Sequence, residues 1–126
     1  MEFPSRSMPR VLVADDEPMV LRLLRDILQS AYEVQSTDSG REALQLHRES
    51  RYDALILDSA MRSLSGVEIV TRVRDRGDRV PIILMTSETP RNSRLDPFAF
   101  AYRVDLLRKP FGVRDLQDAL GRAVGD

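Results

Sequence analysis

Residues 11–18 read V-L-V-A-D-D-E-P, four apolar residues that lead directly into three acidic residues and a proline. A short run that is apolar at every position is typical of a strand covered on both faces, as in a parallel sheet. Residues 54–58, A-L-I-L-D, repeat this arrangement, with an apolar run that again ends in an acid. The two segments predict buried parallel strands whose carboxyl ends carry carboxylates.

Three further segments predict strands, at residues 80–85 and, with weaker patterns, at 33–37 and 104–107. Amphipathic stretches with helical periodicity separate the strands. Helices are predicted from Pro18, after the capping-box sequence Ser39-Gly40-Arg41-Glu42, from Gly66 to a stop at Gly77, and along the apolar positions from Val113 to Val124. The remaining helix, within residues 92–102, contains Pro97 and is expected to be short, kinked or partly absent.

Strand and helix therefore alternate five times. This order predicts an α/β fold, a doubly wound five-stranded parallel sheet with helices on both faces. The size fits the flavodoxin-like strand order 2-1-3-4-5. Residues 1–8 are expected to be a flexible leader or cloning remnant, and residues 9–125 a single domain.

Composition narrows the function classes. The 126 residues are 42% apolar and 31% charged, as in ordinary globular domains, and the absence of cysteine excludes disulfides and thiol chemistry. Nineteen basic and twenty acidic residues give no overall charge to attract nucleic acid or anionic membranes. No apolar run is long enough for a membrane span, so we expect a cytoplasmic protein.

The predicted chemistry lies where the strands end. In a sheet of this order, ligands bind beyond the carboxyl ends of the strands, near the switch between the first and third. Those ends carry Asp15, Asp16, Asp58, Thr86 and Lys109, the last being the only lysine of the chain. Converging carboxylates repel each other unless a cation is present, and an all-oxygen set favours Mg²⁺. Asp58 then offers a nucleophilic oxygen, and Lys109 a charge for a phosphoryl group.

Each residue also has an ordinary structural interpretation when it is taken alone. Asp15 and Asp16 suit a helix start, Asp58 a turn, Thr86 a loop hydroxyl and Lys109 a surface position. Four such coincidences at one sheet edge are much less expected than a single site.

The same residues carry a family resemblance over almost the whole chain. The motifs V-L-V-A-D-D-E-P at 11–18, L-I-L-D-S-A-M-R-S-L-S-G at 55–66, P-I-I-L-M-T-S at 81–87 and K-P-F at 109–111 resemble the receiver domain of two-component response regulators. The resemblance implies that Asp58 is the phosphoacceptor and that Asp15, Asp16, Asp58 and the Ala60 carbonyl hold Mg²⁺. It also implies that Thr86 is the switch hydroxyl and Lys109 the phosphate-binding lysine.

Three positions depart from the pattern of that family. Arg62 stands where proline is common, Leu106 where an aromatic residue usually responds to phosphorylation, and Tyr102-Arg103 where a Gly-Ala turn usually precedes the fifth strand.

The resemblance implies a signalling switch rather than an enzyme with turnover, limited to self-phosphorylation and slow autodephosphorylation. Its implied partners are a sensor histidine kinase or phosphotransfer protein and a downstream output domain or protein, with no nucleic acid or membrane bound by this domain; a homodimer is also compatible. Two alternatives stay open: a receiver-like docking module independent of phosphate, and a Mg²⁺-dependent phosphohydrolase with an aspartate nucleophile. The Asp15-Asp16 spacing does not fit the D-x-D pattern of such hydrolases.

Overall fold

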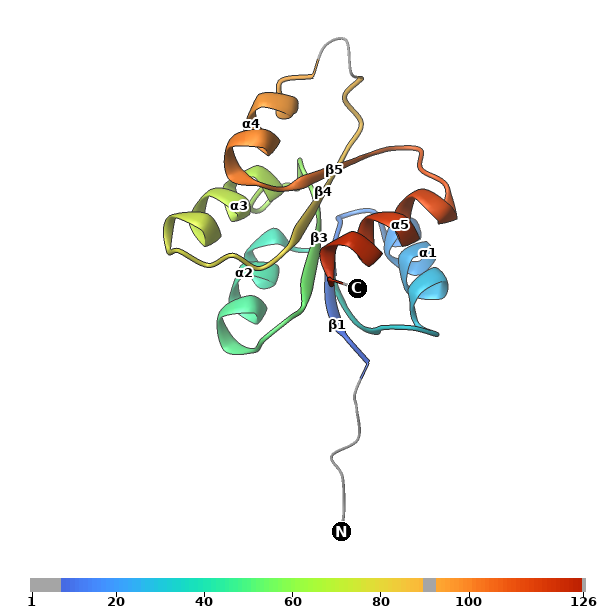
Figure 1. Cartoon of the computed structure of the whole chain (residues 1–126). Coiled ribbons are helices and arrows are strands. Elements are labelled where there is room, and N and C mark those ends of the chain that lie inside the picture. Colours follow the sequence, from blue (N-terminus) through green and yellow to red (C-terminus); the bar gives the residue numbers. More distant parts are fainter. Residues whose placement is uncertain (1–7, 90–92, 126) are drawn as a thin grey trace.

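A computed structural model describes residues 8–89 and 93–125 of the chain, which excludes most of the predicted leader. Five parallel strands form one sheet in the order β2-β1-β3-β4-β5, and Figure 1 shows α1 and α5 on one face and α2, α3 and α4 on the other. This confirms the predicted fold class and strand order. The strands are β1 (Arg10–Ala14), β2 (Glu33–Thr37), β3 (Ala54–Asp58), β4 (Ile82–Thr86) and β5 (Asp105–Arg108). The helices are α1 (Pro18–Leu28), α2 (Gly40–Glu49), α3 (Gly66–Asp75), α4 (Leu95–Tyr102) and α5 (Val113–Ala123).

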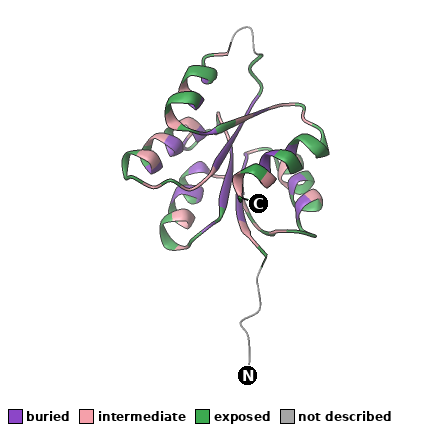
Figure 2. Ribbon diagram, viewed as in Figure 1, coloured by how far each residue is buried: buried purple, intermediate pink, exposed green. Residues whose placement is uncertain are grey.

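Two apolar layers hold the helices to the sheet, because the central strands are apolar on both faces. Alternate residues point to opposite sides: Leu12 and Leu55 pack in the layer under α2 and α3, whereas Val13 and Ile56 pack in the layer under α1 and α5. Figure 2 shows the resulting pattern, with buried strands and exposed outer helix faces. The helices therefore cover both faces of the sheet, which leaves the ends of the strands as the place for a functional site.

The predicted strand boundaries shift where local bonding competes with the ladder. The fourth strand begins at Ile82 rather than at Val80, because Pro81 has no N–H to give to a ladder and the Val80 amide donates to Asp78 Oδ1. The fifth strand covers residues 105–108 instead of 104–107.

The helix predictions need similar corrections. At α2, Ser39 Oγ accepts the Glu42 amide as expected, but the Glu42 carboxylate accepts from Thr37 Oγ1, so the predicted box is only half formed. A reciprocal box is present instead at the start of α3, between Ser65 and Glu68. Val113 begins α5 about half exposed rather than packed. None of the described helices is long and apolar enough to span a bilayer.

The α4 helix is short, and its proline does not break it. Pro97 is its third residue, within the first turn, where a backbone N–H has no partner inside the helix. The C-cap of the helix is Arg103, which has a φ of 58° and a ψ of 56°, a left-handed conformation that glycine adopts most readily.

His47 packs on α2 at the end of the sheet where the strands begin. Its side chain is 9% exposed, and Nε2 lies 2.7 Å from Asp78 Oδ2 in the loop after α3. Partial burial would raise the pKa of Asp78, but the bond from the Val80 amide and the contact with His47 outweigh it and lower this pKa. The contact ties α2 to the chain that leads into β4.

One glycine fixes where α3 meets the sheet. A Cβ on Gly66 would overlap the carbonyl oxygen of Asp58 and lie 2.8 Å from Leu84 Cδ1. Glycine at this position lets the start of α3 approach the end of β3, next to the predicted site.

Replacing Gly66 with alanine is expected to lower the free energy of unfolding by about 1–3 kcal/mol, because backbone must move to admit the methyl group. Gly121→Ala is the matched control: a Cβ there meets nothing within 4 Å, and removing a helix glycine is expected to stabilise by about 0.5–1 kcal/mol. Urea unfolding of the three proteins measures both effects. Equal stability of Gly66→Ala and the original chain would contradict the close approach.

The lowered pKa of Asp78 predicts a pH effect. A carboxyl whose pKa is lower in the folded than in the unfolded state stabilises the fold above the unfolded value, and that contribution disappears as the pH falls through the folded value. The urea midpoint of the original chain should therefore fall more steeply below about pH 4 than that of Asp78→Asn. Asp75→Asn, an exposed change on α3, should keep the original slope; parallel curves for all three would refute the assignment.

Candidate functional site

Parallel strands bring the predicted site residues to one edge of the sheet. Asp15 follows β1, Asp58 ends β3 and Thr86 ends β4, while Lys109 directly follows β5. The register places Asp58 beside Met85, and the Lys109 amide donates to the Thr86 carbonyl over 2.8 Å. Four strand ends thus contribute polar side chains to the same edge, in the order that the topology dictates.

Lys109 joins two of the carboxylates. Its Nζ donates to Asp15 Oδ2 over 2.8 Å and to Asp58 Oδ1 over 3.1 Å, and lies 3.8 Å from Glu17 Oε1. The Asp15 side chain is fully buried, and the side chains of Asp58 and Lys109 are 13% and 17% exposed. Such low exposure strengthens the attraction, since water screens it less than at a surface.

The acidic residues lie close enough to share one ion. Asp15, Asp16 and Asp58 each offer a carboxylate oxygen, and these three oxygens lie within 4.8 Å of one another. Among the residues that the structure describes, this is the one group of three or more acidic or histidine side chains with such spacing. Carboxylate oxygens alone suit a hard divalent cation such as Mg²⁺.

The electrostatic cost of the cluster appears at Asp58. Burial raises the pKa of Asp58, the charge of Asp15 raises it further, and the bond and charge of Lys109 oppose both. Burial would lower the pKa of Lys109, but its bonds to Asp15 and Asp58 raise it above the usual value. The ammonium group of Lys109 therefore only partly offsets the negative charge of the crowded carboxylates. The remaining negative charge favours binding of a further cation at this edge.

The helix-cap interpretation of the two adjacent aspartates does not describe the structure. Glu17 is the N-cap of α1 and makes no side-chain cap bond, while Asp15 Oδ1 accepts the Glu17 amide over 2.9 Å. Asp16 instead faces Arg62, whose Nε lies 3.5 Å from Asp16 Oδ2. Asp15 shapes the turn after β1 and keeps its other oxygen for Lys109.

The two remaining predicted residues lie at the end of β4 and in the turn after β3. Thr86 is 1% exposed, and its Oγ1 accepts the amide of Glu88 over 3.0 Å, which is the local role expected of a loop hydroxyl. Ala60 lies in the turn directly after β3, and its side chain is exposed.

Two further residues at this edge were not predicted to belong to the site. The sequence marks Arg62 only as a residue in place of the family's common proline, and Gly66 only as the start of a helix. Arg62 contacts Asp16, and Gly66 lies against the Asp58 carbonyl. Arg62 lies four residues after Asp58, in the connection between β3 and α3, and Gly66 lies eight residues after Asp58, at the start of α3. This short spacing is a signal that the sequence does carry.

The comparisons with known proteins agree with this arrangement. The response regulator receiver domain family matches residues 11–121. Response regulator MprA of Mycolicibacterium vanbaalenii is 37% identical over 108 residues, 85% of this chain and 46% of that protein. Transcriptional regulatory protein SrrA of Staphylococcus aureus is 29% identical over 84% of this chain and 44% of its own length. The chain thus spans less than half the length of these relatives.

Solved structures give the same result. Chemotaxis protein CheY4 of Vibrio cholerae has a TM-score of 0.81 and 33% identity, covering 93% of this chain and 99% of that one. The receiver domain of sensor histidine kinase PA1611 from Pseudomonas aeruginosa, solved with a magnesium ion coordinated in its active-site cleft, has a TM-score of 0.83 and 28% identity, covering 95% and 100%. Sequence, strand order and acidic edge together make this chain a member of the response regulator receiver domain family.

Proposed function

We propose that this domain is a phosphorylation-controlled signalling switch in which Asp58 accepts a phosphoryl group with the help of Mg²⁺. The observation that supports this most directly is the ion-pair geometry: Lys109 contacts Asp58 and Asp15 at once, within a cluster of three carboxylates. The proposal covers a receiver unit of residues 9–125.

Asp15, Asp16 and Asp58 fit a magnesium ion by their chemistry and spacing, and the Ala60 carbonyl is the fourth protein ligand that we propose. The related domain from Pseudomonas aeruginosa holds magnesium in its own active-site cleft. When bound, Mg²⁺ supplies positive charge that offsets the carboxylates and the phosphoryl oxygens. The remaining chemistry belongs to side chains of this chain.

In the proposed transfer, an Asp58 carboxylate oxygen attacks the phosphorus of a donor's phosphohistidine. A P–O bond forms while the P–N bond breaks, and the imidazole keeps the bonding electron pair and is protonated from solvent. Lys109 releases Asp58 Oδ1 and contacts the arriving phosphoryl oxygens, which carry more negative charge than the carboxylate. Slow hydrolysis of the acyl phosphate resets the switch, so the domain has no turnover on a separate substrate.

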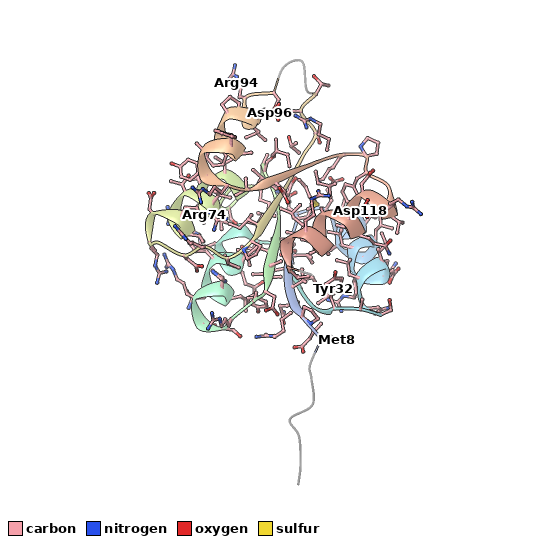
Figure 3. The ribbon with its side chains drawn as sticks, in the orientation of Figure 1. Met8, Tyr32, Arg74, Arg94, Asp96 and Asp118 are labelled. Atoms are coloured by element: carbon pink, nitrogen blue, oxygen red, sulfur yellow. The ribbon has the colours of Figure 1, made fainter. Side chains whose placement is uncertain are left out.

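The proposed output passes through the loop between β4 and α4. The Thr86 hydroxyl now accepts the Glu88 amide, and Glu88 Oε1 accepts the Arg94 amide at the start of α4. Arg94 and Asp96 are labelled at this end of α4 in Figure 3, and Arg108 of β5 donates to both carboxylate oxygens of Asp96 over 2.9 Å. Recruiting the Thr86 hydroxyl to a phosphoryl group changes the first of these bonds and so biases the position of α4.

The proposed partners follow from that scheme. The donor is a sensor histidine kinase or phosphotransfer protein, and the acceptor of the signal is an output domain or protein that contacts the α4–β5 side. The relatives are response and transcriptional regulators more than twice as long as the matched segment, which supports a link to an output unit.

A phosphate-independent docking module remains the competing function, because Leu106 replaces the usual aromatic residue and packs partly buried against the layer under α4. Comparing partner binding by the original chain and Asp58→Ala, each with and without acetyl phosphate, separates the two. Equal affinities in all four conditions favour the docking module.

The nucleophile can be tested by intact-mass analysis after treatment with acetyl phosphate and Mg²⁺. The expected result is a gain of one phosphoryl group in the original chain and none in Asp58→Ala. Asp26→Ala, an exposed change on α1, should behave like the original chain. A phosphoryl group that persists in Asp58→Ala would refute the assignment.

The charge cluster predicts an unusual stability effect. Since the fold raises the pKa of Asp58, ionised Asp58 costs stability, and Asp58→Asn in metal-free buffer at pH 7 should raise the free energy of unfolding by about 1 kcal/mol. Added Mg²⁺ should then stabilise the original chain more than the variant. Thermal unfolding with chelator and with Mg²⁺ measures both; a destabilised Asp58→Asn, with Asp26→Asn unchanged, would count against it.

A further inference from the structure

The acidic edge has two internal cations, and they serve different carboxylates. Lys109 bonds to Asp15 and Asp58, whereas Arg62 pairs with Asp16. Asp16 is the carboxylate of the cluster that Lys109 does not bond among the described contacts. Arg62 therefore supplies the charge that Lys109 leaves missing.

The two cations differ in how firmly they are held. The Lys109 side chain is 17% exposed and donates two hydrogen bonds of 2.8 and 3.1 Å. The Arg62 side chain is 89% exposed, and its ion pair with Asp16 is longer, at 3.5 Å. An exposed pair of this kind contributes little energy and exchanges readily with solvent. Arg62 is consequently the cation that can leave the edge at low cost.

We propose that Arg62 is a built-in competitor of the divalent cation: it neutralises Asp16 while the metal is absent and must release that carboxylate before Asp16 can bind Mg²⁺. This inference rests on the magnesium site of the proposed function. Arg62 belongs to the connection between β3 and α3, so its long side chain can move into solvent while the backbone that holds Asp58 and Gly66 stays in place. The exchange replaces one guanidinium by a divalent ion that serves all three carboxylates.

The ion pair between Arg62 and Asp16 must break before Mg²⁺ binds to Asp16. The apparent affinity for Mg²⁺ is therefore lowered by a factor that the stability of this pair sets. Exposed pairs of this class correspond to about a two- to fivefold change in an equilibrium constant. Removing the positive charge at position 62 therefore tightens magnesium binding, although Arg62 contributes no ligand.

The test is a magnesium chloride titration of the purified chain at constant ionic strength, with the thermal unfolding temperature as the readout. Arg62→Gln should reach half-saturation at about two- to fivefold lower Mg²⁺ than the original chain. Arg62→Lys, which keeps a charge, should stay closer to the original value. Arg72→Gln removes an equal charge from the exposed face of α3 and should leave the half-saturating concentration unchanged.

Each outcome decides a separate point. Equal half-saturation for the original chain and Arg62→Gln, or an equal shift in Arg72→Gln, overturns the competition. No effect of Mg²⁺ on the original chain overturns the magnesium site and the competition with it. The predicted order of affinities combined with no acetyl phosphate labelling of Asp58 in the original chain leaves the competition in place and overturns the phosphorylation switch.

Discussion

The contact of one ammonium group with two carboxylates is the interaction on which the site depends. Lys109 reaches Asp15 and Asp58 only because β1 and β3 are neighbours and β5 ends at the same edge, with β4 between them and the lysine. A strand order that moved β5 away from β1 and β3 would separate these charges and leave a buried aspartate without a partner, which is costly. The sheet topology and the charge balance therefore require each other. The raised pKa of Asp58 reflects the partial compensation by Lys109, and a further cation at this edge would offset the remaining negative charge.

Much of this arrangement can be read from the sequence, because it follows from two simple rules. Strands that are apolar on both faces form parallel sheets, and the carboxyl ends of parallel strands meet at one edge. These rules place Asp15, Asp58 and Lys109 together without knowledge of any contact. The rules fail where a side chain from elsewhere decides the local bonding. Glu42 turns to Thr37 rather than to its own helix start, and Asp78 takes the Val80 amide before β4 can begin. A single sequence carries no pattern for such contacts.

The turn before β5 is another place where contacts from distant residues decide the local structure and the sequence does not reveal them. Arg103 adopts a left-handed backbone conformation, which costs energy for any residue other than glycine. Arg74, on α3, accounts for its persistence: Nε donates to the Tyr102 carbonyl, Nη2 to the Arg103 carbonyl, and Nη1 to the carbonyls of Asp78 and Val80. One guanidinium thus joins α3, the chain that leads into β4 and the end of α4; Figure 3 labels Arg74. From the sequence, Arg74 is one more charge on an arginine-rich helix, because its contacts with the turn before β5 are to backbone carbonyls 28 and 29 residues away.

The charged residues at the two ends of the strands consequently have different kinds of partner. At the edge where strands begin, cations bond to backbone carbonyls and neutral or paired groups: Arg74 fixes the α4–β5 turn, and Arg10 donates to the Arg51 carbonyl and to Ser50 Oγ. These cations therefore find their hydrogen-bond acceptors within the domain itself. At the edge where strands end, carboxylates outnumber the cations that contact them, and the bond between Thr86 and Glu88 leads directly to the start of α4. In the proposed switch, a change of charge at Asp58 would act on the start of α4 through the bond between Thr86 and Glu88, while Arg74 holds the turn that follows the end of α4. Among the described residues, the cluster of three carboxylates lies at this edge, where the proposed phosphorylation would occur.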